Sequence, residues 1–231
     1  MGKIELLHGS ECIIEKPQFL QGKIHNDYGR GFYCTMDYDL AAEWACRHES
    51  DGYINKYLID LDNLKVLDLC DGNHTVLEWI SILLQNRNFR LNTEVSREVR
   101  DYLISNFATD LSKYDIVRGY RADDSYFQYA TAFVENGLSV SGLANAMELG
   151  NLGIQITLIS KKAFKQIVFE EAIPVSKDEY YPRYMERDLE AREKYRTSVK
   201  WNLSRNEVYA MDIIREEMNL DDARIQRIIL R

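Results

Sequence analysis

Residues 28–46 constrain the fold of this chain more than any other stretch, because they combine a glycine turn, a short strand-prone run and a capped helix. Gly29 and Gly31 flank an arginine, and glycine tolerates a positive φ and a close approach of other backbone, so the pair predicts a tight turn. The run Phe-Tyr-Cys-Thr that follows favours a strand. Asp37 or Asp39 can then accept the free amides at the start of a helix.

Two aromatic rings of this stretch are predicted to lie near one another. Tyr33 belongs to the strand-prone run, and Trp44 belongs to the helix, where it shares a face with Leu40 four residues earlier. A ring at a strand end and another on the adjoining helix would wall a flat pocket. The alternative is that both rings are ordinary core residues.

A second informative stretch, residues 3–10, predicts a strand that ends in His8-Gly9-Ser10. Gly9 would let a ligand lie against the backbone, while His8 and Ser10 supply side-chain donors and acceptors. A single histidine of this kind is more often a structural residue that is hydrogen bonded within the fold.

The two stretches together carry a resemblance. His-Gly-Ser followed about twenty residues later by Gly-Arg-Gly-Phe-Tyr resembles the NAD site of ADP-ribosyltransferases, in the histidine–tyrosine branch that includes diphtheria toxin and the poly(ADP-ribose) polymerases. Trp44 falls eleven residues after Tyr33, the spacing at which those polymerases carry a second stacking aromatic. The layout also resembles an uncharacterised bacterial family of the same clan. The resemblance implies an α+β fold, with two mixed sheets split around an NAD cleft and with inserted helices.

The same resemblance implies roles for individual residues. Gly9 would pair the nicotinamide carboxamide through its backbone with Ser10 beside it, and His8 would hold a ribose hydroxyl. Tyr33 would stack on the nicotinamide ring, with Trp44 as the second wall.

One position departs from the polymerases, because the strand on which they carry a catalytic glutamate has Gln155 here. Glutamine can hydrogen bond a ribose hydroxyl but cannot act as a general base or carry a negative charge. Asp123 and Asp124, after a predicted strand, could replace the missing acid, or they could simply cap the next helix. Arg30 could reach a phosphate as a charge-assisted donor.

The resemblance therefore implies an NAD-dependent ADP-ribosyltransferase that uses NAD as its substrate, needs no metal and modifies an unknown acceptor macromolecule. Gln155 disfavours chain formation and leaves single ADP-ribose transfer, NAD hydrolysis, or a non-catalytic NAD-binding or protein-interaction module. Bacterial enzymes of this sort are often toxins, effectors or defence proteins. A cysteine hydrolase, pairing Cys34 with His8 or His25, is a further rival.

The resemblance implies an ADP-ribosyltransferase-like domain over residues 1–173, in which the hydrophobic pattern predicts a helical insertion at about 74–110, and the change of composition beyond Pro174 predicts a helical C-terminal appendage over 174–231. An antitoxin or regulatory partner could bind through those last helices. Strands are also predicted at 53–61 and 64–69, joined as a hairpin through Asp62-Asn63.

Composition excludes some classes of protein. The formal net charge of −8 disfavours a general nucleic-acid binder, which needs a clustered basic face. The four cysteines have no C-x-x-C spacing, and no apolar run approaches the length of a membrane span. The sequence therefore predicts a cytoplasmic protein with no membrane partner.

Overall fold

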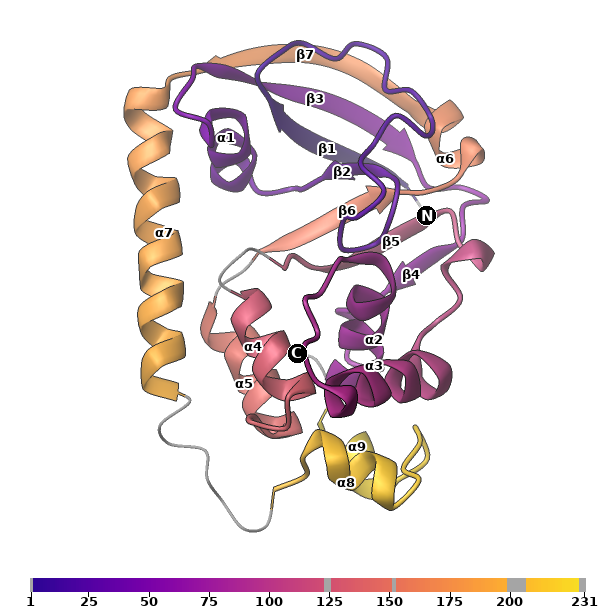
Figure 1. Ribbon diagram of the computed structural model, residues 1–231. Helices are drawn as coiled ribbons and strands as arrows, with labels where there is room; N and C mark the ends of the chain where they lie inside the picture. Colours follow the sequence, from indigo (N-terminus) through magenta and orange to yellow (C-terminus); the bar gives the residue numbers. More distant parts are fainter. Residues whose placement is uncertain (1, 123–125, 151–152, 199–206, 229–231) are drawn as a thin grey trace.

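A computed structural model describes residues 2–122, 126–150, 153–198 and 207–228 of the chain (Figure 1). The strands are β1 (Lys3–Ser10), β2 (Phe32–Cys34), β3 (Gly52–Asp60), β4 (Val66–Asp68), β5 (Ile116–Tyr120), β6 (Ile154–Leu158) and β7 (Ile167–Val175). The helices are α1 (Tyr38–Cys46), α2 (Val76–Asn86), α3 (Glu94–Phe107), α4 (Tyr126–Val134), α5 (Val140–Gly150), α6 (Lys161–Gln166), α7 (Lys177–Ser198), α8 (Ala210–Arg215) and α9 (Ala223–Gln226), with a 3₁₀ turn η1 (Leu111–Lys113).

The strands form two sheets, which confirms an α+β architecture. One sheet has the order β1-β3-β7 and is antiparallel throughout. The other has the order β2-β6-β5-β4 and is mixed, because β4 and β5 run parallel. The predicted hairpin at Asp62-Asn63 is wrong: β3 and β4 are both strands, but they lie in different sheets.

Among the described residues, one antiparallel bridge joins the backbones of the two sheets, between β1 and the residue after β2. The Leu7 N–H donates to the Thr35 carbonyl and the Thr35 N–H donates to the Leu7 carbonyl, each over 2.8 Å. Beyond this bridge β1 and β2 form no further backbone pair in the part of the chain that the structure describes, so His8, Gly9 and Ser10 lie past the paired position.

Helix α1 begins at a side-chain cap and packs against the first sheet. The Asp37 carboxylate accepts from the Leu40 N–H over 3.0 Å, which selects Asp37 rather than Asp39 as the N-cap. Leu40, Ala41 and Ala45 are fully buried on the helix. The small residues at 41 and 45 allow the helix backbone to approach β1 closely.

Helices α2, α3, α4, α5, α8 and α9 pack together beside the second sheet as one apolar core (Figure 1). Capping boxes at Thr75 and Thr93 start α2 and α3. Ile213, Met218 and Ile225 are buried in the same core, and the Val76 N–H donates to the Ile228 carbonyl. The end of the segment expected as an appendage is therefore part of the core.

Helix α7 follows β7 directly and runs alongside the molecule from α1 to the region of α4 and α5 (Figure 1). Arg187 on α7 donates to the Glu43 carboxylate on α1 over 2.8 Å, and the Glu43 side chain is 4% exposed. This pair ties α7 to α1 close to the point where the sheets diverge. Within the described residues, no helix is long and apolar enough to cross a membrane.

Candidate functional site

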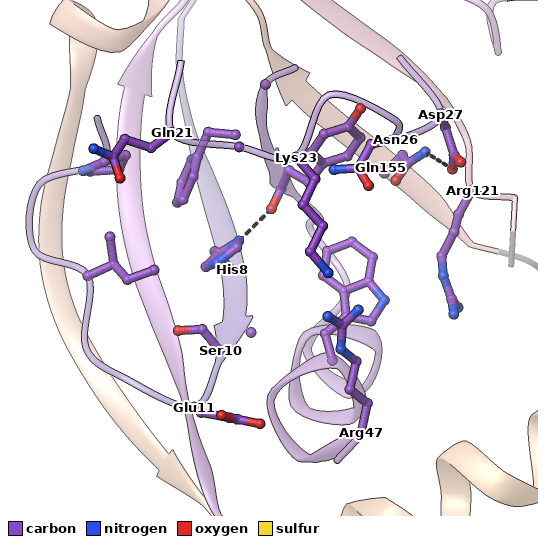
Figure 2. Close-up of a pocket in the computed structure, with 18 of the residues that line it drawn as sticks. His8, Ser10, Glu11, Gln21, Lys23, Asn26, Asp27, Arg47, Arg121 and Gln155 are labelled. Atoms are coloured by element: carbon purple, nitrogen blue, oxygen red, sulfur yellow. Dashed lines mark hydrogen bonds between the residues drawn. The ribbon is translucent and has the colours of Figure 1, made fainter. Parts of the chain in front are cut away.

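A cavity of about 820 Å³ opens where the two sheets diverge (Figure 2). The end of β1, the start of β2, helix α1 and the loop over residues 11–31 contribute to its lining. Residues at the end of α2, after β5, on β6 and on α7 complete it. The cavity thus collects residues from segments far apart in the chain.

His8 and Tyr33, which the sequence predicts to act together, are joined by a hydrogen bond. The His8 Nδ1 lies 2.6 Å from the Tyr33 carbonyl oxygen. Because a carbonyl can only accept, Nδ1 carries the proton, and Nε2 of the neutral ring is left as an acceptor. Burial lowers the pKa of His8, the Tyr33 carbonyl opposes that shift, and the charge of Arg47 reinforces it. His8 can therefore accept a hydrogen bond from a hydroxyl.

The ring of His8 is also held by packing. Its centroid lies 4.4 Å from that of Phe32, with the planes tilted by 32°. The hydrogen bond at Nδ1 and this contact fix the imidazole on both its edge and its face, so its accepting nitrogen has a defined direction.

Gly9 is a glycine because of helix α1. A Cβ at this position would lie 1.8 Å from the Ala41 carbonyl oxygen and 2.7 Å from the Ala45 nitrogen, so only glycine allows this packing. The sequence predicts that a ligand makes the close approach at Gly9. In the structure a helix does so on one face of the strand.

The backbone of Gly9 is nevertheless directed toward the cavity. Residues two apart in a strand turn their N–H and C=O groups to the same side, and Leu7 uses that side to bind Thr35. Gly9 lines the cavity, and its N–H and C=O groups point away from β3. Both groups are therefore available to a ligand amide. Ser10 also lines the cavity, but its hydroxyl donates to the Cys12 carbonyl and accepts from Asn55.

Tyr33 and Trp44 both line the cavity, as predicted. The Tyr33 hydroxyl donates to the Gly29 carbonyl over 2.7 Å and accepts from the Tyr28 N–H over 3.0 Å. Burial raises the pKa of the Tyr33 phenol, and the nearby Asp27 charge adds to this effect. Gly29 has a φ of 73°, so the predicted glycine turn also places the carbonyl that anchors this ring. We refer to His8, Gly9, Tyr33 and Trp44 as the aromatic group.

Gln155 reaches the cavity from β6 and is almost fully buried. Its Nε2 donates to the Asp27 carboxylate over 2.7 Å and to the Tyr120 carbonyl over 3.3 Å. Both partners are acceptors, which fixes the amide orientation and leaves Oε1 as the free acceptor of the side chain.

Asp27 is one of the site residues that the sequence does not predict. It is 5% exposed and lines the cavity from the loop before Gly29. An aspartate directly before a glycine turn is most simply a turn former, so nothing local distinguishes it. Asp123 and Asp124, the predicted replacement acids, lie outside the described residues.

The cations of the cavity are also dispersed in the sequence. Arg30 is exposed and is not among the residues that line the cavity. Among the described residues, the basic side chains of the lining are Lys16, Lys23, Arg47, Arg87, Arg121 and Arg187, against the acidic Glu11, Asp27 and Asp188. Lys23, Arg47 and Arg121 extend into the cavity from separate segments (Figure 2).

Arg121 is the most informative of these cations. Its guanidinium lies 6.0 Å from the centroid of the Trp44 ring, and its buried Nη1 has no hydrogen-bond partner in the described residues. A buried donor without a partner is costly, and an anionic ligand would satisfy it. We refer to Asp27, Arg87, Arg121 and Gln155 as the polar group.

A family model described as "Protein of unknown function (DUF3990)" matches residues 4–169, which include both groups. The match ends before α7, whose Arg187 contributes to the lining. No curated protein and no solved structure matches the chain.

Proposed function

The chain belongs to the DUF3990 family of proteins of unknown function, and we propose that it binds NAD in the cavity and transfers ADP-ribose from it with release of nicotinamide. A single ADP-ribose unit passes to an acceptor macromolecule. Where water is the acceptor, the protein acts as an NAD hydrolase. A bacterial toxin, effector or defence role is consistent with this chemistry and is part of the proposal.

One observation carries the proposal: His8 and Gly9 from β1 and Tyr33 from β2 lie at one cavity, with His8 hydrogen bonded to the Tyr33 backbone over 2.6 Å. The neutral His8 offers an acceptor for a ribose hydroxyl. Gly9 offers a backbone donor and acceptor for the carboxamide, and the immobilised Tyr33 ring offers a flat surface.

The charge of the cavity supports the same ligand. The basic side chains of its lining outnumber the acidic ones, in a chain whose formal net charge is −8. A concave site with this local excess attracts an anion. We assign the pyrophosphate of NAD to the part of the cavity lined by basic side chains. Arg121 takes there the phosphate-binding role that the sequence suggested for Arg30.

In the proposed reaction the bond between the ribose C1′ and the pyridine nitrogen breaks heterolytically. The nitrogen keeps the bonding electron pair, so nicotinamide leaves as a neutral molecule and positive charge develops on the ribose. A lone pair of the acceptor then forms the new bond to C1′, and the acceptor proton passes to solvent. Gly9 and His8 hold the two sides of the breaking bond, which restricts it to a reactive geometry.

A non-catalytic NAD-binding module is the second candidate, and Gln155 is the observation that favours it. An amide cannot supply the negative charge of the glutamate found at this position in the polymerases. Such a module would keep the NAD affinity of the cavity and lose the chemical step.

Incubation of the purified protein with NAD, with chromatographic detection of nicotinamide, tests the proposal. We expect nicotinamide together with free or acceptor-bound ADP-ribose. NADH is the matched control, because its uncharged dihydropyridine ring is a poor leaving group and should not be released. Binding of NAD without release would favour the module, and absence of binding in a calorimetric titration would refute both candidates.

A further inference from the structure

The aromatic group leaves one requirement of the proposed reaction unmet. Positive charge develops on the ribose when the glycosidic bond breaks, and a fixed negative charge nearby lowers that barrier. His8 is neutral, Gly9 and Tyr33 carry no charge, and Gln155 is an amide. The inference that follows rests on the proposed function and concerns the source of this charge.

Asp27 is a buried carboxylate in direct contact with Gln155. Its Oδ2 accepts from the Gln155 Nε2 over 2.7 Å (Figure 2). The same oxygen accepts from the Ala122 N–H over 2.9 Å. Its Oδ1 is also buried and has no hydrogen-bond partner in the described residues. Arg87 approaches that oxygen with its Nε at 3.5 Å, too far for a normal hydrogen bond.

These contacts bear on the ionisation of Asp27. Burial raises the pKa of its carboxyl group, while the charge of Arg87 and the hydrogen bonds from Ala122 and Gln155 oppose that shift. Two N–H donors aimed at one oxygen favour the carboxylate form, because a carboxylate accepts more strongly than a neutral acid. The two donors at Oδ2 and the Arg87 side chain near Oδ1 are the contacts from which we infer a negative charge in the site despite the glutamine at position 155.

The contact also sets the direction of the glutamine. Both Nε2 hydrogens are used, one toward Asp27 and one toward Tyr120, so Oε1 is the atom of Gln155 that a ligand can meet. A carbonyl oxygen at this place can accept a hydrogen bond from a ribose hydroxyl.

We propose that Asp27 is the charged positioning residue of the site. It fixes Gln155 so that Oε1 accepts a ribose hydroxyl of NAD, and its carboxylate stabilises the positive charge that develops at C1′. Asp27 and Gln155 together then take the place of the single glutamate of the polymerases. The glutamine supplies the contact, and the aspartate supplies the charge.

A purely structural role makes a different prediction. Asp27 also anchors the loop over residues 11–31 to the end of β5 through the Ala122 amide. In Asp27→Asn, one side-chain oxygen can still accept from both Ala122 and Gln155, so the anchoring contacts survive, while the charge is removed and an NH2 group replaces the oxygen nearest Arg87. This substitution separates the two roles.

The experiment measures kcat and KM for nicotinamide release, and thermal unfolding, for four proteins. These are the wild type, Asp27→Asn, the double variant Asp27→Asn with Gln155→Glu, and Asp115→Asn. Asp115 is the matched control, because its side chain is 14% exposed and accepts from Lys65 and Ser160, but it does not line the cavity.

We expect Asp27→Asn to lower kcat by about 100-fold, as removal of one stabilising group from a charged transition state typically does, with KM and the unfolding temperature nearly unchanged. The double variant returns the carboxylate to position 155 and loses both hydrogen bonds that the Gln155 Nε2 donates, and it should recover kcat by about tenfold over Asp27→Asn, since part of the electrostatic stabilisation is restored. Asp115→Asn should keep the wild-type kcat.

A wild-type kcat in folded Asp27→Asn overturns the inference and leaves the proposed function standing. If Asp27→Asn does not fold, a double variant that folds but turns over no faster than background overturns the inference. A wild type that neither binds nor cleaves NAD overturns the proposed function and this inference together.

Discussion

The aromatic group and the polar group of the cavity are held in place by different kinds of interaction. The aromatic group lies on or beside regular elements, and backbone contacts fix it: the bridge between Leu7 and Thr35, and the packing of α1 on Gly9. The polar group comes from a loop, a helix end, a strand end and β6, and the Asp27 carboxylate joins these segments through Arg87, the Ala122 N–H and Gln155. We infer that the aromatic group determines where a ligand lies, and that the polar group determines the electrostatic environment of the bound ligand.

The largest expected effect tests the aromatic group directly. His8→Ala and Tyr33→Ala should each lower kcat/KM for nicotinamide release by about 100-fold or more, as loss of a positioning group at the reacting centre does. The release assay used for the wild type measures this effect. His25→Ala is the control, because His25 is exposed and does not line the cavity, and its rate should be unchanged. Equal rates in all three variants would make His8 and Tyr33 ordinary structural residues.

Gly9→Ala tests whether backbone packing holds the aromatic group. The new methyl group would collide with the Ala41 carbonyl, so α1 must shift, and overpacking of this kind costs about 2 kcal/mol. We expect the unfolding temperature to fall by about 4 to 8 °C.

Gly2→Ala is the matched control for this substitution, since a Cβ there meets nothing within 4 Å. An unchanged unfolding temperature in Gly9→Ala would contradict the helix packing seen here.

Arg121→Gln tests the role of the polar group in NAD binding. Loss of the guanidinium should raise the dissociation constant for NAD by about tenfold, equivalent to about 1.4 kcal/mol. Arg30→Gln should leave it unchanged, because Arg30 is exposed outside the cavity. Calorimetric titration measures both constants, and the opposite ranking would make Arg30 the phosphate ligand.

The smallest expected effect is the response of the aromatic group to pH. Burial holds the pKa of His8 below its ordinary value of 6.5. Below 6.5 the unfolded chain therefore binds a proton that the folded state resists, so stability decreases as the pH falls through this range. NAD binding should weaken at still lower pH, because a protonated Nε2 donates rather than accepts. His8→Gln should abolish this dependence, and its persistence in that variant would assign it to another group.

How far the sequence predicts the structure also differs between the two groups. The strand ending in His8-Gly9-Ser10, the turn at Gly29 and the helix carrying Trp44 depend on local patterns, and the structure confirms these elements. Asp27 and Arg121 acquire their significance only when loop and strand ends meet, which no local pattern records.

Two further differences between the sequence-based expectation and the structure, at Asp62-Asn63 and at the C-terminal helices, have the same origin. Asp62-Asn63 has the composition of a turn, but composition does not determine which sheet the next strand joins. The short helices α8 and α9 each bury one apolar side, as Ile213 and Ile225 show, and their partner is a core formed by residues more than fifty positions away.

A crystal structure of the protein with a non-cleavable NAD analogue tests the central claim most directly. We predict that the nicotinamide ring lies against Tyr33, that its carboxamide binds the Gly9 backbone, and that a ribose hydroxyl donates to His8. An analogue bound with its nicotinamide ring away from Tyr33 and Gly9 would contradict the account.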